Sequence, residues 1–152
     1  AYPADRKKCS EQTETLSRRL IVLQLFGLAG AFYGASGVLL GAFGAHALKN
    51  TLSPASLETW QTAVSYQLIH ALALLAVFLM VRQSAMSGAE IGLAVKIAGW
   101  GFLIGVVLFS GSLYALCFGA GALFGPITPL GGVSFIVGWI ALAVAIWKID
   151  GV

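Results

Sequence analysis

The stretch GLAGAFYGASGVLLGAFG, residues 27–44, is the strongest indication of the fold class in this sequence. Its glycines follow one another at steps of three or four residues, which places them on one face of an α-helix. Glycine is unfavourable in a soluble helix, but in a membrane small side chains let neighbouring helices pack closely. No Asp, Glu, Lys or Arg occurs from Leu20 to Leu48. The stretch therefore predicts a first transmembrane helix at the centre of a bundle, with a packing face of Gly27, Gly30, Gly34, Gly37, Gly41 and Gly44.

The composition is that of an integral membrane protein. Of the 152 residues, 59% are hydrophobic and 10% are charged, whereas a soluble domain has about 25% charged residues. The uncharged runs are Leu20–Leu48, Thr59–Val81 and Ile97–Trp147. The third run is too long for a single span of about 20 residues, and Gly119–Gly132 interrupts it. We therefore predict an all-α membrane protein, a bundle of four transmembrane helices with spans at about 20–45, 59–82, 96–118 and 131–148.

The basic residues predict the orientation of the bundle. With four spans both termini share one side, and that side carries all but one of the basic residues: Arg6, Lys7, Lys8, Arg18, Arg19, Arg82, Lys96 and Lys148. The positive-inside rule places this side in the cytoplasm or an organellar matrix, so we expect a bacterial or mitochondrial-type inner membrane. Because the charges lie at span ends, the net charge of +3 does not indicate nucleic-acid binding. Residues 1–19 form a polar N-terminal arm, flexible or suited to docking on a partner, and residues 20–152 form the membrane domain.

Polar side chains are expected to gather in the outer half of the bundle. Counted down helix two from Trp60, which we place at the membrane interface, His70 lies near the bilayer centre, at about 1.5 Å per residue. Polar groups in hydrocarbon need partners, so they should face the bundle. The predicted polar cluster is His46, Tyr66, Gln67, His70, Ser110, Ser112, Tyr114 and Thr128. On helix three, Gly101 and Gly105 form a second small-residue face that suits packing on helix one.

Two interpretations of this cluster stay open. In one, it lines a polar cavity that opens outward and holds a solute, a lipid or quinone headgroup, or water. In the other, which we favour because no span contains a carboxylate, His70 is neutral and bonds a neighbouring helix. Ser110 or Ser112 with His70 lacks an orienting acid, so no catalytic site is predicted. His46 and His70 differ in depth by about 15 Å, so no metal site is predicted, and no cofactor is expected.

Several short motifs resemble one family of small membrane proteins. They are Gly41-Ala42-Phe43-Gly44-Ala45-His46, Trp60-Gln61-Thr62, Tyr66-Gln67 with His70, Leu108-Phe109-Ser110-Gly111-Ser112-Leu113-Tyr114, and Thr128-Pro129-Leu130-Gly131-Gly132 with Gly138-Trp139. Together they are similar to the YgdD/YwdK family, domain of unknown function 423, whose animal relatives are called transmembrane protein 256. The similarity covers roughly Gly30 to Trp147, while the arm is longer than expected for bacterial members. The resemblance implies a four-helix membrane protein and supplies no known activity.

The sequence therefore favours a structural or accessory subunit of a larger membrane complex over an enzyme. The chain is small, with short loops and no charged pathway through the membrane. Its expected partners are membrane lipids and other integral membrane subunits, and no nucleic acid. The alternative is a protein that binds or transports a small polar or amphipathic molecule, such as a lipid, a quinone or a solute.

Overall fold

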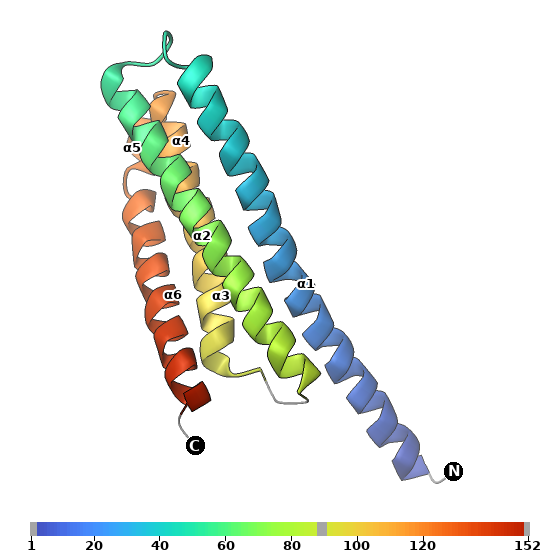
Figure 1. Cartoon of the computed structure of the whole chain (residues 1–152). Coiled ribbons are helices and arrows are strands. Elements are labelled where there is room, and N and C mark those ends of the chain that lie inside the picture. Colours follow the sequence, from blue (N-terminus) through green and yellow to red (C-terminus); the bar gives the residue numbers. More distant parts are fainter. Residues whose placement is uncertain (1–2, 88–90, 151–152) are drawn as a thin grey trace.

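The computed structural model describes residues 3–87 and 91–150, and all regular secondary structure within them is helical (Figure 1). The elements are α1 (Pro3–His46), α2 (Pro54–Met86), α3 (Leu93–Gly105), the π-helix η1 (Val106–Ser110), α4 (Gly111–Cys117), α5 (Gly121–Phe124) and α6 (Ile127–Asp150). Four stretches are long and apolar enough to cross a membrane: Gln24–His46, Pro54–Met86, Leu93–Cys117 and Ile127–Lys148. The predicted all-α fold with four membrane helices is confirmed.

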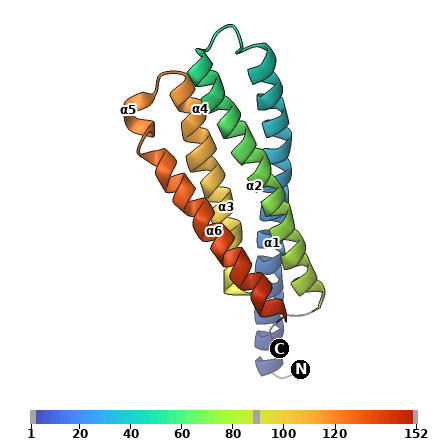
Figure 2. The ribbon, with the colours of Figure 1, turned by 60° about the vertical axis from the view of Figure 1, so that its left-hand side comes forward.

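The helix at the centre of the bundle is α2. It packs on α1 along one side and on α3, η1 and α4 along another, while α6 packs against α3 and η1. Figures 1 and 2 show α1 at the edge of the bundle, with α2 between it and α3. The expectation that the first span is central is therefore wrong. Helix α1 can lie at the edge because an apolar surface suits lipid as well as protein. A glycine face in the sequence therefore does not show how many helices pack against it.

The two ends of the bundle differ. The start of α1 and the end of α6 lie at one end, called the terminal end here, and the connections 47–53 and 118–126 lie at the other, the loop end (Figure 1). The 44 residues of α1 give a helix of about 65 Å, about twice the 30 Å of a bilayer's hydrocarbon. The backbone of the predicted polar arm thus continues α1 as one helix from Pro3, past the other helices.

Local sequence signals set where the helices begin and end at the loop end. The Ser53 hydroxyl accepts a hydrogen bond from the Ser56 N–H at 3.2 Å, and Pro54 is the first residue of α2, where a missing N–H costs nothing. Gly119, with φ of +88°, follows α4 and turns the chain. Helix α6 begins at Ile127, four residues before the expected span at 131, so that Thr128 and Pro129 lie in its first turn.

Glycines allow close contact along two helix pairs. A Cβ atom would meet atoms of α2 at Gly27, Gly30, Gly37, Gly41 and Gly44, for example 2.7 Å from Leu68 Cδ2 at Gly37, whereas at Gly34 it would meet nothing within 4 Å. On α3, a Cβ at Gly101 would lie 2.9 Å from the Cα of Gly138, and one at Gly105 would meet the Phe135 ring. Gly101 and Gly105 therefore face α6 and not helix one, which corrects the sequence expectation.

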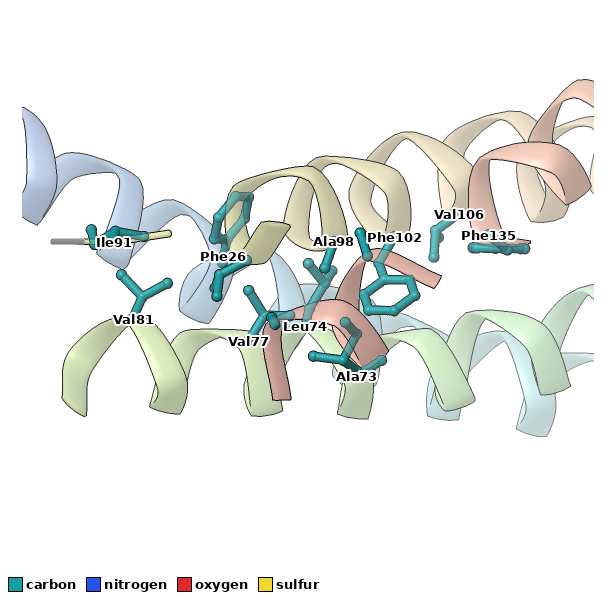
Figure 3. Packing of buried hydrophobic residues seen from close by; sticks show 14 residues of the cluster. Phe26, Ala73, Leu74, Val77, Val81, Ile91, Ala98, Phe102, Val106 and Phe135 are labelled. Atoms are coloured by element: carbon teal, nitrogen blue, oxygen red, sulfur yellow. The ribbon is translucent and has the colours of Figure 1, made fainter. Parts of the chain in front are cut away.

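The apolar core lies between α2, α3 and α6, and α1 adds the buried Phe26 and the partly buried Tyr33 to it. Phe26 of α1 is fully buried with Leu74, Val77 and Phe102 (Figure 3). A Cβ at Gly99 would lie 2.5 Å from the Phe26 ring, so the glycine makes the space that the ring fills. Because lipid is as apolar as these side chains, the core stabilises the bundle through van der Waals contact.

Candidate functional site

His70 lies midway along α2, where only 3% of its surface is exposed. Its Nδ1 atom is 2.7 Å from the Tyr66 carbonyl oxygen, and the Trp139 indole N–H donates to Nε2 at 3.2 Å. The imidazole also stacks on the Phe135 ring, with centroids 3.5 Å apart and planes 11° apart. When the ring is neutral with its proton on Nδ1, Nδ1 donates to the Tyr66 carbonyl and Nε2 accepts from the Trp139 indole, so both nitrogens are paired. A second proton, on Nε2, would point at the indole N–H, which is also a donor.

The partner of His70 differs from the one expected from the sequence. Depth alone suggested Tyr66 or the segment Ser110–Tyr114, but the side-chain bond comes from Trp139 of α6. Neither Ser110 nor Ser112 is bonded to His70. The two ring nitrogens are paired with the Tyr66 carbonyl and the Trp139 indole. A lone tryptophan within an apolar span gives no signal of an inward bond, since indole suits membrane interfaces and cores alike.

Gln67 connects three spans. Its Nε2 donates to the Tyr33 carbonyl oxygen at 2.9 Å and to Ser36 Oγ at 2.8 Å, both on α1. Its Oε1 accepts from the Tyr114 hydroxyl of α4 at 3.0 Å. The residue is 4% exposed. Tyr33 in turn donates its hydroxyl proton to the Leu103 carbonyl of α3 at 3.3 Å. The Gln67 amide thus joins α1, α2 and α4, and the sequence did not single out Tyr33 or Ser36.

A separate pair joins α4 to the start of α6. The hydroxyls of Ser112 and Thr128 are 2.7 Å apart, and each also lies within bonding range of a carbonyl of its own segment, Phe109 for Ser112 and Phe124 for Thr128. One more hydroxyl bond, from Ser134 to the Gly101 carbonyl at 2.9 Å, joins α6 to α3. These bonds fix the register of α6 along the third span.

The third span is not a uniform α-helix as the sequence suggested. Residues Val106–Ser110 form a π-helical turn, and the Gly111 N–H reaches back five residues to the Val106 carbonyl. Ser110 lies at its end, 1% exposed, and its Oγ has no hydrogen-bond partner among the residues that the structure describes. Such turns shift the faces of a helix by inserting one residue, which here directs Tyr114 to Gln67 and Ser112 to Thr128.

The side chains of the remaining predicted residues, His46 and Tyr66, take no part in these bonds. His46 is the exposed last residue of α1. Tyr66 is 41% exposed and packs its ring on Phe109, with centroids 4.5 Å apart. A cavity of about 190 Å³ at the loop end is lined by residues outside the predicted cluster: Ala55, Ser56, Thr59, Leu116 and Cys117. The structure thus divides the cluster into separate bonded groups on different helix pairs.

Trp60, which the sequence predicts at the depth of the membrane interface, faces the bundle. Only 3% of its surface is exposed, and its indole N–H donates to the Leu40 carbonyl of α1 at 2.9 Å. Its ring packs on Tyr114, with centroids 4.6 Å apart, and Gly44 leaves room for it on α1. Nearby, the Cys117 thiol donates to the Ser56 carbonyl at 3.2 Å and holds α4 on the start of α2.

The geometry determines what these residues can do chemically. His70 has its two nitrogens engaged, and Gln67 has both ends of its amide engaged. Among the side chains that the structure describes, no three of His, Cys, Asp or Glu lie where they would bind one metal ion. The arrangement therefore supplies bonds between spans, in which polar atoms that lipid cannot satisfy are satisfied by neighbouring helices.

A chain with four apolar helices joined by such bonds is an integral membrane protein of the small polytopic class. The family described as "Protein of unknown function (DUF423)" matches residues 40–132. The chain belongs to this family, as the motif resemblance predicted.

Bacterial relatives are similar over most of the chain. A UPF0382 membrane protein of Staphylococcus saprophyticus is 42% identical over 127 residues, which are 84% of this chain and 100% of the relative. The UPF0382 membrane protein YwdK of Bacillus subtilis is 41% identical over 126 residues, 83% of this chain and 98% of the relative. A UPF0382 membrane protein of Haemophilus influenzae is 40% identical over 126 residues, 83% of this chain and 93% of the relative. No solved structure shows a significant match.

Proposed function

We propose that this protein is a structural subunit of a larger membrane assembly and that α1 is the helix that binds the partner subunit. The observation that carries the proposal is the position of α1. In the apolar part of its span only 17% of the residues are buried, whereas the corresponding shares in the second, third and fourth spans are 44%, 44% and 33%. Along its glycine face it contacts α2, and it touches α3 through Phe26 and Tyr33.

The surface of α1 that faces away from α2 suits another helix. Its large exposed side chains, as far as the structure describes them, are Ile21, Leu25, Leu28, Phe32, Val38, Leu39 and Phe43, and all of these except Val38 follow one another at steps of three, four or seven residues. Such steps keep them in one seam, the pattern by which helices pack side by side. Exposed Ala35 and Ala42 lie in the same seam, and small residues let a second helix approach. The partner in this proposal is a transmembrane helix of a different protein.

The helical extension of α1 supports the same role. From Pro3 the backbone runs as one helix into the span, and this segment carries charges of both signs, Asp5, Arg6, Lys7, Lys8, Glu11 and Glu14 among them. A charged helix that extends beyond the apolar span offers the partner a second point of contact, with electrostatic selectivity. The proposal assigns no reaction to the protein, because His70 and Gln67 hold the bundle together through the bonds described above.

Site-specific photocrosslinking in the native membrane tests the proposal. A photoreactive amino acid is placed at Phe32 on α1, which is 67% exposed, or at Ile140 on α6, which is 60% exposed, as a matched control. We expect Phe32 to yield one dominant crosslinked protein of defined mass and Ile140 to yield mainly lipid adducts. Equal protein crosslinking from both positions would contradict a docking role of α1. A crosslink only to a second copy of this chain would replace the proposed partner by a homo-oligomer.

A further inference from the structure

A second feature of the structure lies far from the bonded groups, at the terminal end. A partly open cavity of about 650 Å³ lies between the last turns of α2, the first turn of α3 and the last turns of α6. Its volume falls within the range of about 300–1,000 Å³ that small-molecule sites occupy. Its wall is mostly apolar and includes Leu79, Met80, Leu93, Ala94, Val95 and Ala145. None of the described residues in the lining belongs to α1, so the site is argued independently of the surface proposed for docking.

The polarity of the lining changes along the helices. On α2 the apolar Leu79 and Met80 are followed, one turn closer to the terminal end, by Gln83 and Ser84. On α6 the apolar Ala145 is followed by Lys148. Both helices run toward the terminal end (Figure 1). The apolar residues of the lining therefore lie deeper in the bundle, and the polar residues lie nearer its terminal end. This gradient matches that of a lipid molecule in the leaflet on the same side.

The polar part of the lining contains a basic side chain. Among the residues that the structure describes, Lys148 is the one charged residue in the lining. The Ser84 hydroxyl donates to the Met80 carbonyl at 3.1 Å, and the Ser87 hydroxyl donates to the Ser84 carbonyl at 3.1 Å, so the serine protons are used within α2. An ammonium group beside an apolar cavity at headgroup depth favours a lipid phosphate that carries net negative charge. A free inorganic anion would leave the apolar wall without contacts.

We propose that this cavity binds one anionic phospholipid of the leaflet on the terminal side, with part of an acyl chain against Leu79, Leu93 and Val95 and the phosphate at Lys148. The lipid would fill the space between the ends of α2, α3 and α6. Neither the docking role of α1 nor the bonds at His70 and Gln67 are needed for this site.

Native mass spectrometry of the full chain in a mild detergent tests the site. The protein is mixed with palmitoyl-oleoyl phosphatidylglycerol or with the zwitterionic phosphatidylcholine of the same chains, at equal concentrations. We expect one tightly retained phosphatidylglycerol, bound about fivefold more strongly than phosphatidylcholine, the factor expected for one basic residue near an anionic headgroup. Lys148→Gln should abolish this preference. Lys96→Gln is the matched control, because Lys96 is exposed at the same end of the bundle and does not line the cavity.

A second variant tests the apolar part. Ala94 is half-buried in the cavity wall, and Ala94→Phe would place a ring where the acyl chain is proposed to lie, so binding of both lipids should fall. Lys148→Gln changes an exposed side chain and leaves the core intact, so the charge test stands even if Ala94→Phe does not fold. Retention of the phosphatidylglycerol preference in Lys148→Gln, or its equal loss in Lys96→Gln, would overturn the proposal. Displacement of phosphatidylglycerol by inorganic phosphate would assign the site to a free anion instead.

Discussion

Replacing Gln67 with leucine removes the amide that joins α1, α2 and α4 while keeping a side chain of similar length. The substitution deletes three side-chain bonds, to the Tyr33 carbonyl, to Ser36 Oγ and from the Tyr114 hydroxyl. Double-mutant cycles in membrane proteins average about 0.6 kcal/mol for each hydrogen bond between helices, so the expected loss is about 2 kcal/mol. Gln61→Leu, on the same helix but at an exposed position, should cost less than about 0.5 kcal/mol.

The assay is reversible unfolding of the purified protein in mixed detergent and SDS micelles, from which the free energy of unfolding is obtained. Tyr114→Phe removes one of the three bonds and should cost about 0.6 kcal/mol alone but almost nothing in the Gln67→Leu background. That coupling isolates the hydrogen bond from any change in packing. An equal cost of Tyr114→Phe in both backgrounds, or a Gln67→Leu protein as stable as the wild type, would show that the Gln67 amide does not stabilise the bundle through these hydrogen bonds.

Three further predictions address other parts of the fold. His70→Leu should lower the free energy of unfolding by about 1–3 kcal/mol, because the Trp139 N–H loses its acceptor. His70→Gln should lower it by about 1 kcal/mol or less. Equal losses in the two variants would show that this hydrogen bond does not stabilise the bundle. Gly37→Leu should separate α1 from α2 and lower the thermal midpoint in detergent, whereas Gly34→Leu, where a Cβ meets nothing within 4 Å, should not, and identical midpoints would contradict the packing. In a protein otherwise free of cysteine, a thiol at Gly121 should react with an impermeant reagent added outside the cell and one at Ser87 should not; the reverse pattern would invert the topology.

Charge and apolar run length were sufficient to predict the four spans. The runs that ended at Arg82, Lys96 and Lys148 located three helix ends at the terminal side within a few residues, because ionisable groups avoid hydrocarbon. The start of α2 at Ser53 and Pro54 lies before the expected span at 59, and the capping chemistry there is local in sequence. The arrangement of the helices was less accessible. A membrane helix is apolar on every side, so its composition does not distinguish lipid-facing from protein-facing surface, and the place of α1 was predicted wrongly.

The polar groups show a similar limit. Sequence reasoning found His70 and Gln67 as residues that need partners, because polar groups in hydrocarbon must be satisfied. It did not find Trp139 or the carbonyl of Tyr33 as those partners, since both depend on which helices adjoin. The π-helical turn Val106–Ser110 also left no pattern in the sequence, because one inserted residue shifts side chains without changing the hydrophobicity of the run.

The claim that α1 binds a partner subunit is tested most directly by the mass of the assembly isolated at native abundance in a mild detergent. Ala35→Phe places a ring in the exposed seam of α1, and Ala143→Phe places the same ring on an exposed position of α6. We expect a stoichiometric complex for the wild type and for Ala143→Phe, and the mass of the free chain for Ala35→Phe. A wild-type protein with the mass of the free chain, or a complex equally retained or equally lost in the two variants, would contradict it.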